Sequence, residues 1–195
     1  MTKRYYTLGL LAGFLLLPLL GHSQAQKGDL MVSVHSRPIV GWGGNFGLLS
    51  NGQLGTKLGY MATDHLEIGL QSKGQLQANG SLPLQYRLST GVYATHYFGH
   101  RRLQPFLSGG ISGVAGNLPY QVNTQSGDLY GTENYLSVNY NLSAGLQYRL
   151  VKNLHVFGEW QYSKPILSTP ITQSPVKPQR WQPATFGIRW RLGGR

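Results

Sequence analysis

Residues 135–150 read YLSVNYNLSAGLQYRL and alternate between two kinds of side chain. The even-numbered positions are Leu, Val, Tyr or Ala, whereas the odd-numbered positions are mostly Ser, Asn, Gln and Arg. Successive side chains of a β-strand point to opposite faces, so this pattern predicts a strand with one apolar and one polar face. At about 16 residues, the strand is roughly three times as long as the usual strand of a soluble protein.

The same alternation recurs along the chain, and beyond the N-terminal region no stretch keeps the period of an amphipathic helix. The pattern predicts strands at residues 29–37, 53–62, 66–75, 84–98, 103–115, 135–150, 154–163 and 184–192. Short connections at 63–65, 99–102 and 151–153 alternate with long ones at 38–52, 76–83, 116–134 and 164–183. This order predicts an all-β fold, an eight-stranded antiparallel up-and-down transmembrane barrel with both termini on the short-turn side.

With this architecture, the chain resembles the small eight-stranded outer-membrane β-barrel family, of the OmpX and OmpW kind, across essentially all of the sequence after residue 25. The closing segment Phe186–Leu192 is similar to that family's C-terminal assembly signal, an alternating strand that ends near an aromatic residue. It departs from that form because Leu192, Gly193, Gly194 and Arg195 follow Trp190. The resemblance implies a bacterial outer-membrane protein that is inserted by the barrel-assembly machinery.

The N-terminus has the features of a secretory signal peptide. Lys3 and Arg4 precede an apolar run from Leu8 to Leu20, and Ser23 and Ala25 occupy the small-residue positions of a cleavage site. The apolar run is well short of the roughly 20 residues that a transmembrane helix needs. We therefore expect a signal peptide over residues 1–25 and one barrel domain over residues 26–195. The chain has no cysteine, which excludes disulfides and a lipoprotein anchor.

The mature chain is strongly basic. Without Lys3 and Arg4, 15 basic residues face six acidic ones, a net charge of +9. A nucleic-acid partner does not fit an exported protein, so the expected counter-charge is acidic lipid or the phosphate of lipopolysaccharide.

An eight-stranded barrel is just wide enough for side chains to fill its interior, and the polar face of each strand must then point inward. We expect a lumenal ionic cluster in which Glu67 and Glu159 each pair with a lumenal cation, since buried charges need partners. The inward charged positions are Lys57, Glu67, Lys73, Arg87, Arg149, Glu159, Arg189 and Arg191.

Aromatic residues on the outward face gather near strand ends, as expected for the two interfaces of a membrane. Tyr60, Phe98, Tyr148 and Trp190 are predicted near the short turns, and Tyr86, Trp160 and Tyr162 near the long loops. The general preference of aromatic residues for strands is the alternative explanation.

The sequence offers no clear catalytic, metal or cofactor site. His155 and Glu159 share the inward face, but a lumenal polar pair explains them better than half of a catalytic set. The glycines of Gly41–Gly44 and Gly109–Gly110 lack the helix and lysine of a phosphate-binding loop and are interpreted as loop residues or strand bends. The five prolines between Ser163 and Pro183 predict an extended loop there.

The favoured hypothesis is an integral outer-membrane protein with a structural or surface-interaction role, a filled polar lumen and no enzymatic activity. A barrel that binds or transports a small hydrophobic ligand would need apolar inward residues, and a lipid-modifying enzyme would need a catalytic triad. A soluble, lipocalin-like barrel would have its apolar residues inside instead.

Overall fold

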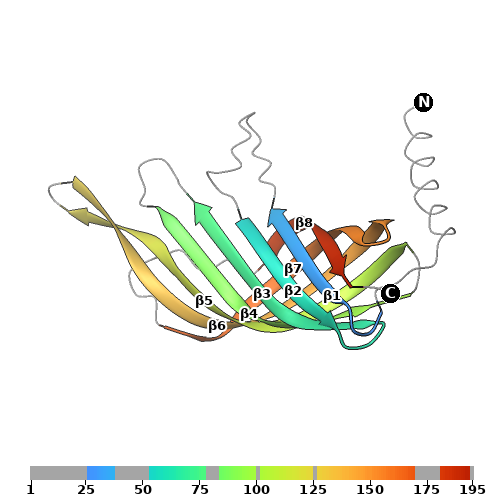
Figure 1. Cartoon of the computed structure of the whole chain (residues 1–195). Coiled ribbons are helices and arrows are strands. Elements are labelled where there is room, and N and C mark those ends of the chain that lie inside the picture. The colour runs from blue at the N-terminus through green and yellow to red at the C-terminus, as the bar shows by residue number, and fades with distance from the viewer. Residues whose placement is uncertain are drawn as a thin grey trace, which may run out of the picture.

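The barrel consists of eight consecutive antiparallel strands (Figure 1). The computed structural model describes residues 26–37, 53–77, 84–99, 102–124, 127–169 and 181–193, so the expected signal peptide and the glycines of 41–44 lie outside the described residues. Among the described residues, no helix has both the length and the apolar character needed to cross a bilayer. The strands are β1 (Leu30–Arg37), β2 (Gln53–Met61), β3 (Leu66–Gln77), β4 (Gln85–Tyr97), β5 (Leu103–Thr124), β6 (Gly127–Val151), β7 (Leu154–Ser168) and β8 (Trp181–Leu192).

Each strand pairs with the next along the chain, and the first pairs with the last. The closing ladder between β1 and β8 runs from Leu30 opposite Leu192 to Ser36 opposite Phe186. Closure leaves the sheet without an open edge along this ladder, so the backbone N–H and C=O groups are paired within the wall. The predicted fold class is therefore confirmed.

The two faces of the wall point as the alternation predicted. Leu136 and Leu142 are 62% and 54% exposed on the outside of the barrel, whereas Arg149 and Arg189 are 8% and 0% exposed inside it. Among the outward strand residues whose side chains the structure describes, Lys164 on β7 is the one Asp, Glu, Lys or Arg. A soluble barrel with an apolar interior is thereby excluded, since its large apolar side chains would be shielded from solvent.

The prediction of a long loop at residues 116–134 is wrong, because most of this stretch belongs to strands β5 and β6. β5 and β6 continue as a regular ladder to Thr124 opposite Gly127, which makes them strands of 22 and 25 residues joined by a two-residue connection. This β5–β6 hairpin extends beyond the other strands in Figure 1. The alternation weakens in this stretch: Asn117 and Leu118, which follow each other at the base of the hairpin, are both buried, so burial there does not alternate with parity.

The base of the β5–β6 hairpin is held to β4 by one side chain. Asn117 donates from Nδ2 to the carbonyl of Leu84 at 3.0 Å and accepts from the backbone N–H of Tyr86 at 2.7 Å. The β4–β5 ladder ends one residue earlier, where Arg87 pairs with Gly116. The amide of Asn117 therefore continues the hydrogen bonding of the ladder past its last residue pair.

Two other expected loop boundaries are also wrong. β7 runs through Pro165 to Ser168, and β8 already begins at Trp181, so the expected loop at 164–183 is shorter at both ends. A register shift in the β6–β7 ladder lies next to the pair of Asn139 and Pro165. Proline is tolerated in a strand at such an irregularity, because no ladder hydrogen bond is required of its nitrogen. β3 likewise runs to Gln77, two residues further than expected.

Candidate functional site in the barrel lumen

An ion pair crosses the lumen between opposite walls. Lys57 on β2 donates from Nζ to both carboxylate oxygens of Glu159 on β7, at 3.0 Å to Oε1 and 2.8 Å to Oε2. Ser143 on β6 adds a longer contact from its hydroxyl to Oε2 at 3.4 Å. Both charged side chains are almost completely buried. The pair thus links two strands that share no ladder, as the lumenal position of both residues predicted.

A second network surrounds Glu67 on β3. Its carboxylate lies 3.6 Å from the Arg189 guanidinium and accepts hydrogen bonds from the hydroxyls of Tyr93 and Tyr97, one on each oxygen. Both members of the ion pair are fully buried. The expectation that Glu67 pairs with a lumenal cation is confirmed. Tyr93 donates to Oε1, and Tyr97 donates to Oε2, the oxygen that also lies near the guanidinium.

Arg189 on β8 connects this network to two further strands, β1 and β6. Its Nε donates to the Ser33 hydroxyl of β1 at 2.9 Å, and one terminal nitrogen donates to the Gln147 side-chain oxygen of β6 at 2.9 Å and to the hydroxyl of Tyr97. The planar fork of a guanidinium suits such branching contacts better than an ammonium group would. Arg189 on β8 therefore contacts polar side chains from four other strands, β1, β3, β4 and β6.

Aromatic rings enclose the two buried cations. The Arg189 guanidinium lies 4.9 Å from the ring centre of Phe157, 5.5 Å from that of Tyr97 and 5.9 Å from that of Phe106. Lys57 Nζ lies 5.6 Å from the ring centre of Tyr93 and 5.8 Å from that of Phe157. Cations within about 6 Å of ring faces gain favourable electrostatic energy, most of all where water is excluded.

The lumen is less polar than the sequence analysis expected. Met31, Met61, Tyr97, Phe106 and Phe157 form one buried apolar cluster inside the barrel. Sequence parity already assigned Phe157 to the inward face, and Tyr93 and Tyr97 share their parity with the buried Thr95. The parity signal is present, but the predicted lumen rests on charged residues and the predicted interface aromatics are outward ones only, so Tyr93, Tyr97 and Phe106 were not predicted as lumenal.

Small residues on the wall make room for the lumenal side chains. A Cβ atom on Gly59 would come within 2.6 Å of the Cγ of Glu67, on the paired strand β3. At Gly55, a Cβ atom would come within 2.5 Å of Cε1 of His35. Glycine at these two positions therefore admits side chains that alanine would displace.

Two of the other predicted lumenal charges, Arg149 and Arg191, lie toward the short-turn end. Arg191 forms an ion pair with Asp29 at 2.7 Å between its Nε and Oδ2, both largely buried. Asp29 was missed because it lies at the boundary of the first predicted strand. Arg149 is also buried, and its backbone N–H donates to the carbonyl of Arg102 at 2.9 Å. The structure therefore separates the predicted ionic cluster into distinct pairs along the lumen.

The outward aromatics point away from the lumen as predicted. Tyr60, Phe98, Trp160 and Trp190 are exposed on the outer wall. The ring of Tyr162 packs against that of Tyr140 on β6, with 6.0 Å between ring centres, and Tyr148 is half-buried. Their role as membrane-interface residues stays a prediction.

Two small cavities remain between the lumenal side chains. One lies beside Lys57, Tyr93 and Glu159 with a free volume of about 10 Å³, and the other beside Lys73 and Arg87 with about 20 Å³. Each has room for about one water molecule. The larger hollows lie on the outer wall, for example beside Leu136, Val138 and Leu167.

His155 and Glu159 share the lumen, but the carboxylate is committed to Lys57. In the described ranges, no three His, Asp or Glu side chains come close enough together to hold a metal ion. The lumen of the barrel is thus a packed interior, stabilised by ion pairs and aromatic rings.

Comparison with known proteins shows which solved structures share this fold. Neither protein-family models nor curated protein sequences match the chain. Among solved structures, the N-terminal β-barrel domain of Pseudomonas aeruginosa OprF is similar, with a TM-score of 0.54 and 17% identity, over 87% of this chain and 100% of that one. Neisserial surface protein A gives a TM-score of 0.48 with 14% identity over 84% of this chain and 96% of that one. The Yersinia pestis outer membrane protein Ail in a phospholipid bilayer nanodisc gives 0.47 with 16% identity, over 85% and 100%. At these identities the likeness concerns the fold, which is that of small outer-membrane β-barrels.

Proposed function

We propose that this protein is an integral protein of the bacterial outer membrane with a structural and surface-interaction role rather than a catalytic one. In this proposal, the closed barrel anchors the chain in lipid and the β5–β6 hairpin extends from it on the long-loop side. Export through a signal peptide cleaved after Ala25, and kinship with barrels of the OmpX and OmpW kind, belong to the same proposal.

The observation that carries the proposal is the inverted distribution of side chains across one closed wall. Leu54 and Trp160 are 60% and 63% exposed outside, while the Lys57–Glu159 and Arg189–Glu67 pairs are buried inside. In water, such a wall would leave a continuous apolar surface far larger than monomeric soluble proteins carry. In a bilayer, the same surface meets acyl chains and the closed ladder satisfies the backbone.

A sealed lumen supports an anchoring role over transport. The aromatic residues Tyr97, Phe106 and Phe157 and the Arg189–Glu67 pair together fill the short-turn half, and the Lys57–Glu159 pair crosses the lumen beside them. A hydrophobic ligand would need the volume that these side chains occupy. The alternative of a ligand-transporting barrel is therefore not favoured.

The β5–β6 hairpin supports a role at the cell surface. Eight residues of β5, from Asn117 to Thr124, continue past the last residue pair with β4. At the rise of a β-strand, they span roughly 25 Å.

The basic net charge makes lipopolysaccharide phosphate and acidic lipid the natural partners around the barrel, and insertion by the barrel-assembly machinery follows from the same proposal.

The test begins with the full chain expressed in a Gram-negative host. We expect it in the outer-membrane fraction, with folded and heat-unfolded forms of different mobility on a gel. The purified protein in planar bilayers should conduct no steady ionic current, because the lumen is filled. Recovery as soluble periplasmic protein without a mobility difference would contradict the membrane proposal, and stable open channels would contradict the sealed lumen.

A further inference from the structure

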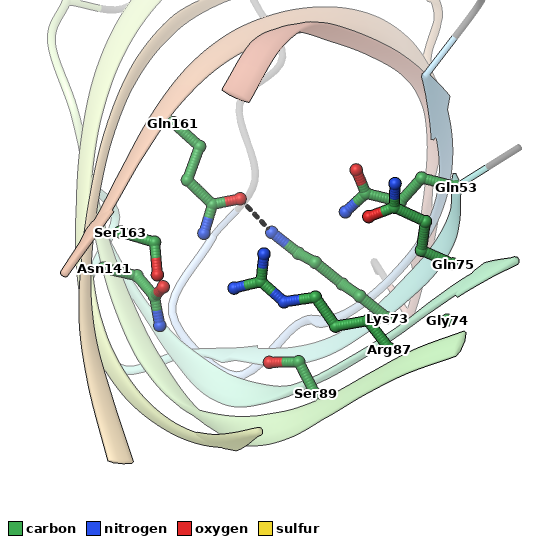
Figure 2. Close-up of a pocket in the computed structure, with 9 residues that line it drawn as sticks. All are labelled: Gln53, Lys73, Gly74, Gln75, Arg87, Ser89, Asn141, Gln161 and Ser163. Carbon is green, nitrogen blue, oxygen red and sulfur yellow. Dashed lines mark hydrogen bonds between the residues drawn. The ribbon is translucent and has the colours of Figure 1, made fainter. Parts of the chain in front are cut away.

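The long-loop half of the lumen holds two cations beside one small cavity. Lys73 on β3 and Arg87 on β4 both reach into it, and the guanidinium of Arg87 lies beside the Lys73 side chain in Figure 2. Lys73 is 8% exposed and donates from Nζ to the side-chain oxygen of Gln161, a neutral acceptor. Among the residues that the structure describes, Arg87 has no hydrogen-bond or ion-pair partner. Two cations thus share a confined space with no carboxylate in its lining.

Three of the six acidic residues of the chain are already engaged by other lumenal cations. Asp29 pairs with Arg191, Glu67 with Arg189 and Glu159 with Lys57. None of these carboxylates lines the cavity beside Lys73 and Arg87. Glu159 does line the neighbouring cavity together with Lys73, so Lys73 has a carboxylate on its other side, whereas among the described residues Arg87 has none.

The remaining acids are also placed elsewhere. Asp64 accepts a hydrogen bond from the backbone N–H of Lys27 at 2.9 Å, at the short-turn end. Asp128 and Glu133 lie on β6, in the part of the β5–β6 hairpin beyond the β4–β5 ladder. The stretches 38–52, 78–83 and 170–180 contain no Asp or Glu at all. Since no connection on the long-loop side carries an acid, the natural counter-charge is an anion from solution.

Neutral side chains around the cavity add hydrogen-bond donors. The Gln161 oxygen is occupied by Lys73, which leaves its amide N–H groups as donors. The Ser163 hydroxyl accepts from Asn139 Nδ2 at 3.1 Å, so its own hydrogen is free to be donated. Gln53, Gln75 and Asn141 bring amide oxygens as well as N–H donors, but no lining residue is an anion, and the five N–H donors of Arg87 and the ammonium of Lys73 carry the only charges of the lining. Such a set matches an oxyanion, which accepts several hydrogen bonds at once.

We propose that this cavity is a subsite for the phosphate or sulfate group of a solute that enters from the long-loop end. The cavity is partly open, and its free volume of about 20 Å³ has room for about one oxygen atom of such a group, while the rest of the solute lies toward the long-loop mouth. The wall around the cavity is a continuous ladder, so bilayer headgroups outside it do not reach these side chains. This inference goes beyond the proposed anchoring role and stands independently of it.

The test uses the full chain folded in detergent micelles and inorganic phosphate as the probe. Arginine Nε–H resonances are followed by NMR during titration with phosphate, with potassium chloride at equal ionic strength as the reference. We expect the Arg87 resonance to shift saturably with phosphate alone. Phosphate affinity, measured by calorimetry, should fall at least tenfold in Arg87→Gln and in Lys73→Gln. Lys152→Gln, which removes one positive charge in the exposed β6–β7 turn, is the matched control and should bind as the wild type does.

A heat-modifiability gel verifies that each variant is folded, and Arg87, which is only half-buried, carries the test if Lys73→Gln does not fold. Equal shifts with chloride and phosphate would reduce the site to unspecific charge screening and overturn the proposal. Unchanged affinity in the folded Arg87→Gln variant would place phosphate binding elsewhere and do the same. Lipopolysaccharide added without free phosphate should leave the Arg87 resonance in place; a shift with lipopolysaccharide but not with phosphate would overturn entry from the aqueous side.

Discussion

Replacing Lys57 with methionine removes the cation from the ion pair that crosses the lumen. Glu159 is then left 1% exposed with the Ser143 hydroxyl, 3.4 Å from Oε2, as its remaining side-chain hydrogen-bond partner among the described residues. At a separation of 2.8 Å and an effective dielectric constant of about 20, the lost Coulomb attraction is about 6 kcal/mol. The desolvation of both groups offsets part of it, and breaking a buried pair on one side costs about 3–5 kcal/mol. We expect the free energy of unfolding to fall by that amount.

The assay is urea unfolding in phospholipid vesicles, followed by tryptophan fluorescence and by the mobility of folded protein on gels. The double variant Lys57→Met with Glu159→Gln replaces both charges and should return to within about 1.5 kcal/mol of the wild type, because no uncompensated charge remains. Lys152→Met, at an exposed turn position, should change stability by less than about 0.5 kcal/mol. A loss below about 1 kcal/mol in Lys57→Met, or a double variant less stable than both single ones, would refute the reasoning.

Three further variants test other parts of the fold. Leu142→Arg places a charge on the lipid-facing wall and should cost about 2–4 kcal/mol in vesicle unfolding if this position lies near the bilayer midplane; an unchanged stability would argue against lipid contact there. Glu67→Gln leaves Arg189 buried without its carboxylate, so the urea midpoint should drop by the equivalent of about 3 kcal/mol; an unaltered midpoint would mean that Ser33, Tyr97 and Gln147 satisfy Arg189 without an anion. Asn117→Ala removes two hydrogen bonds worth about 1 kcal/mol each and should speed amide exchange at Tyr86 while the barrel stays folded; unchanged exchange at Tyr86 would show that the β5–β6 hairpin does not depend on Asn117.

The ion pairs and the apolar cluster explain how a barrel without disulfides keeps its lumen filled. The charged pairs tie β2 to β7 and β3 to β8, which are not neighbours in the sheet. Aromatic rings from β4, β5 and β7 surround the cations and exclude water from them. Removing one partner leaves the other charge buried without a counter-charge. Breaking these pairs therefore costs more free energy of folding than breaking a solvent-exposed pair.

Several features of the fold were predictable because they are local properties of the chain. Alternation along residues 135–150 decides which side chains share a face, and it already assigned Arg149 to the inside and Leu142 to the outside. The same reasoning predicted that Glu67 and Glu159 would find lumenal cations. It was less successful where alternation is weak, as at residues 117–124, and where a strand contains a proline, as at Pro165.

Local pattern by itself determined the number of strands, their faces and the inverted character of the wall, since each depends only on residues close in sequence. Only the tertiary structure decided which charged residues form ion pairs. Lys57 and Glu159 are 102 residues apart in sequence and are brought together by the register and closure of the barrel. The length of the β5–β6 hairpin and the position of Lys73 and Arg87 beside one cavity also depend on the register of the closed barrel. Such contacts depend on strand stagger around a closed sheet, a property that no single stretch of sequence contains.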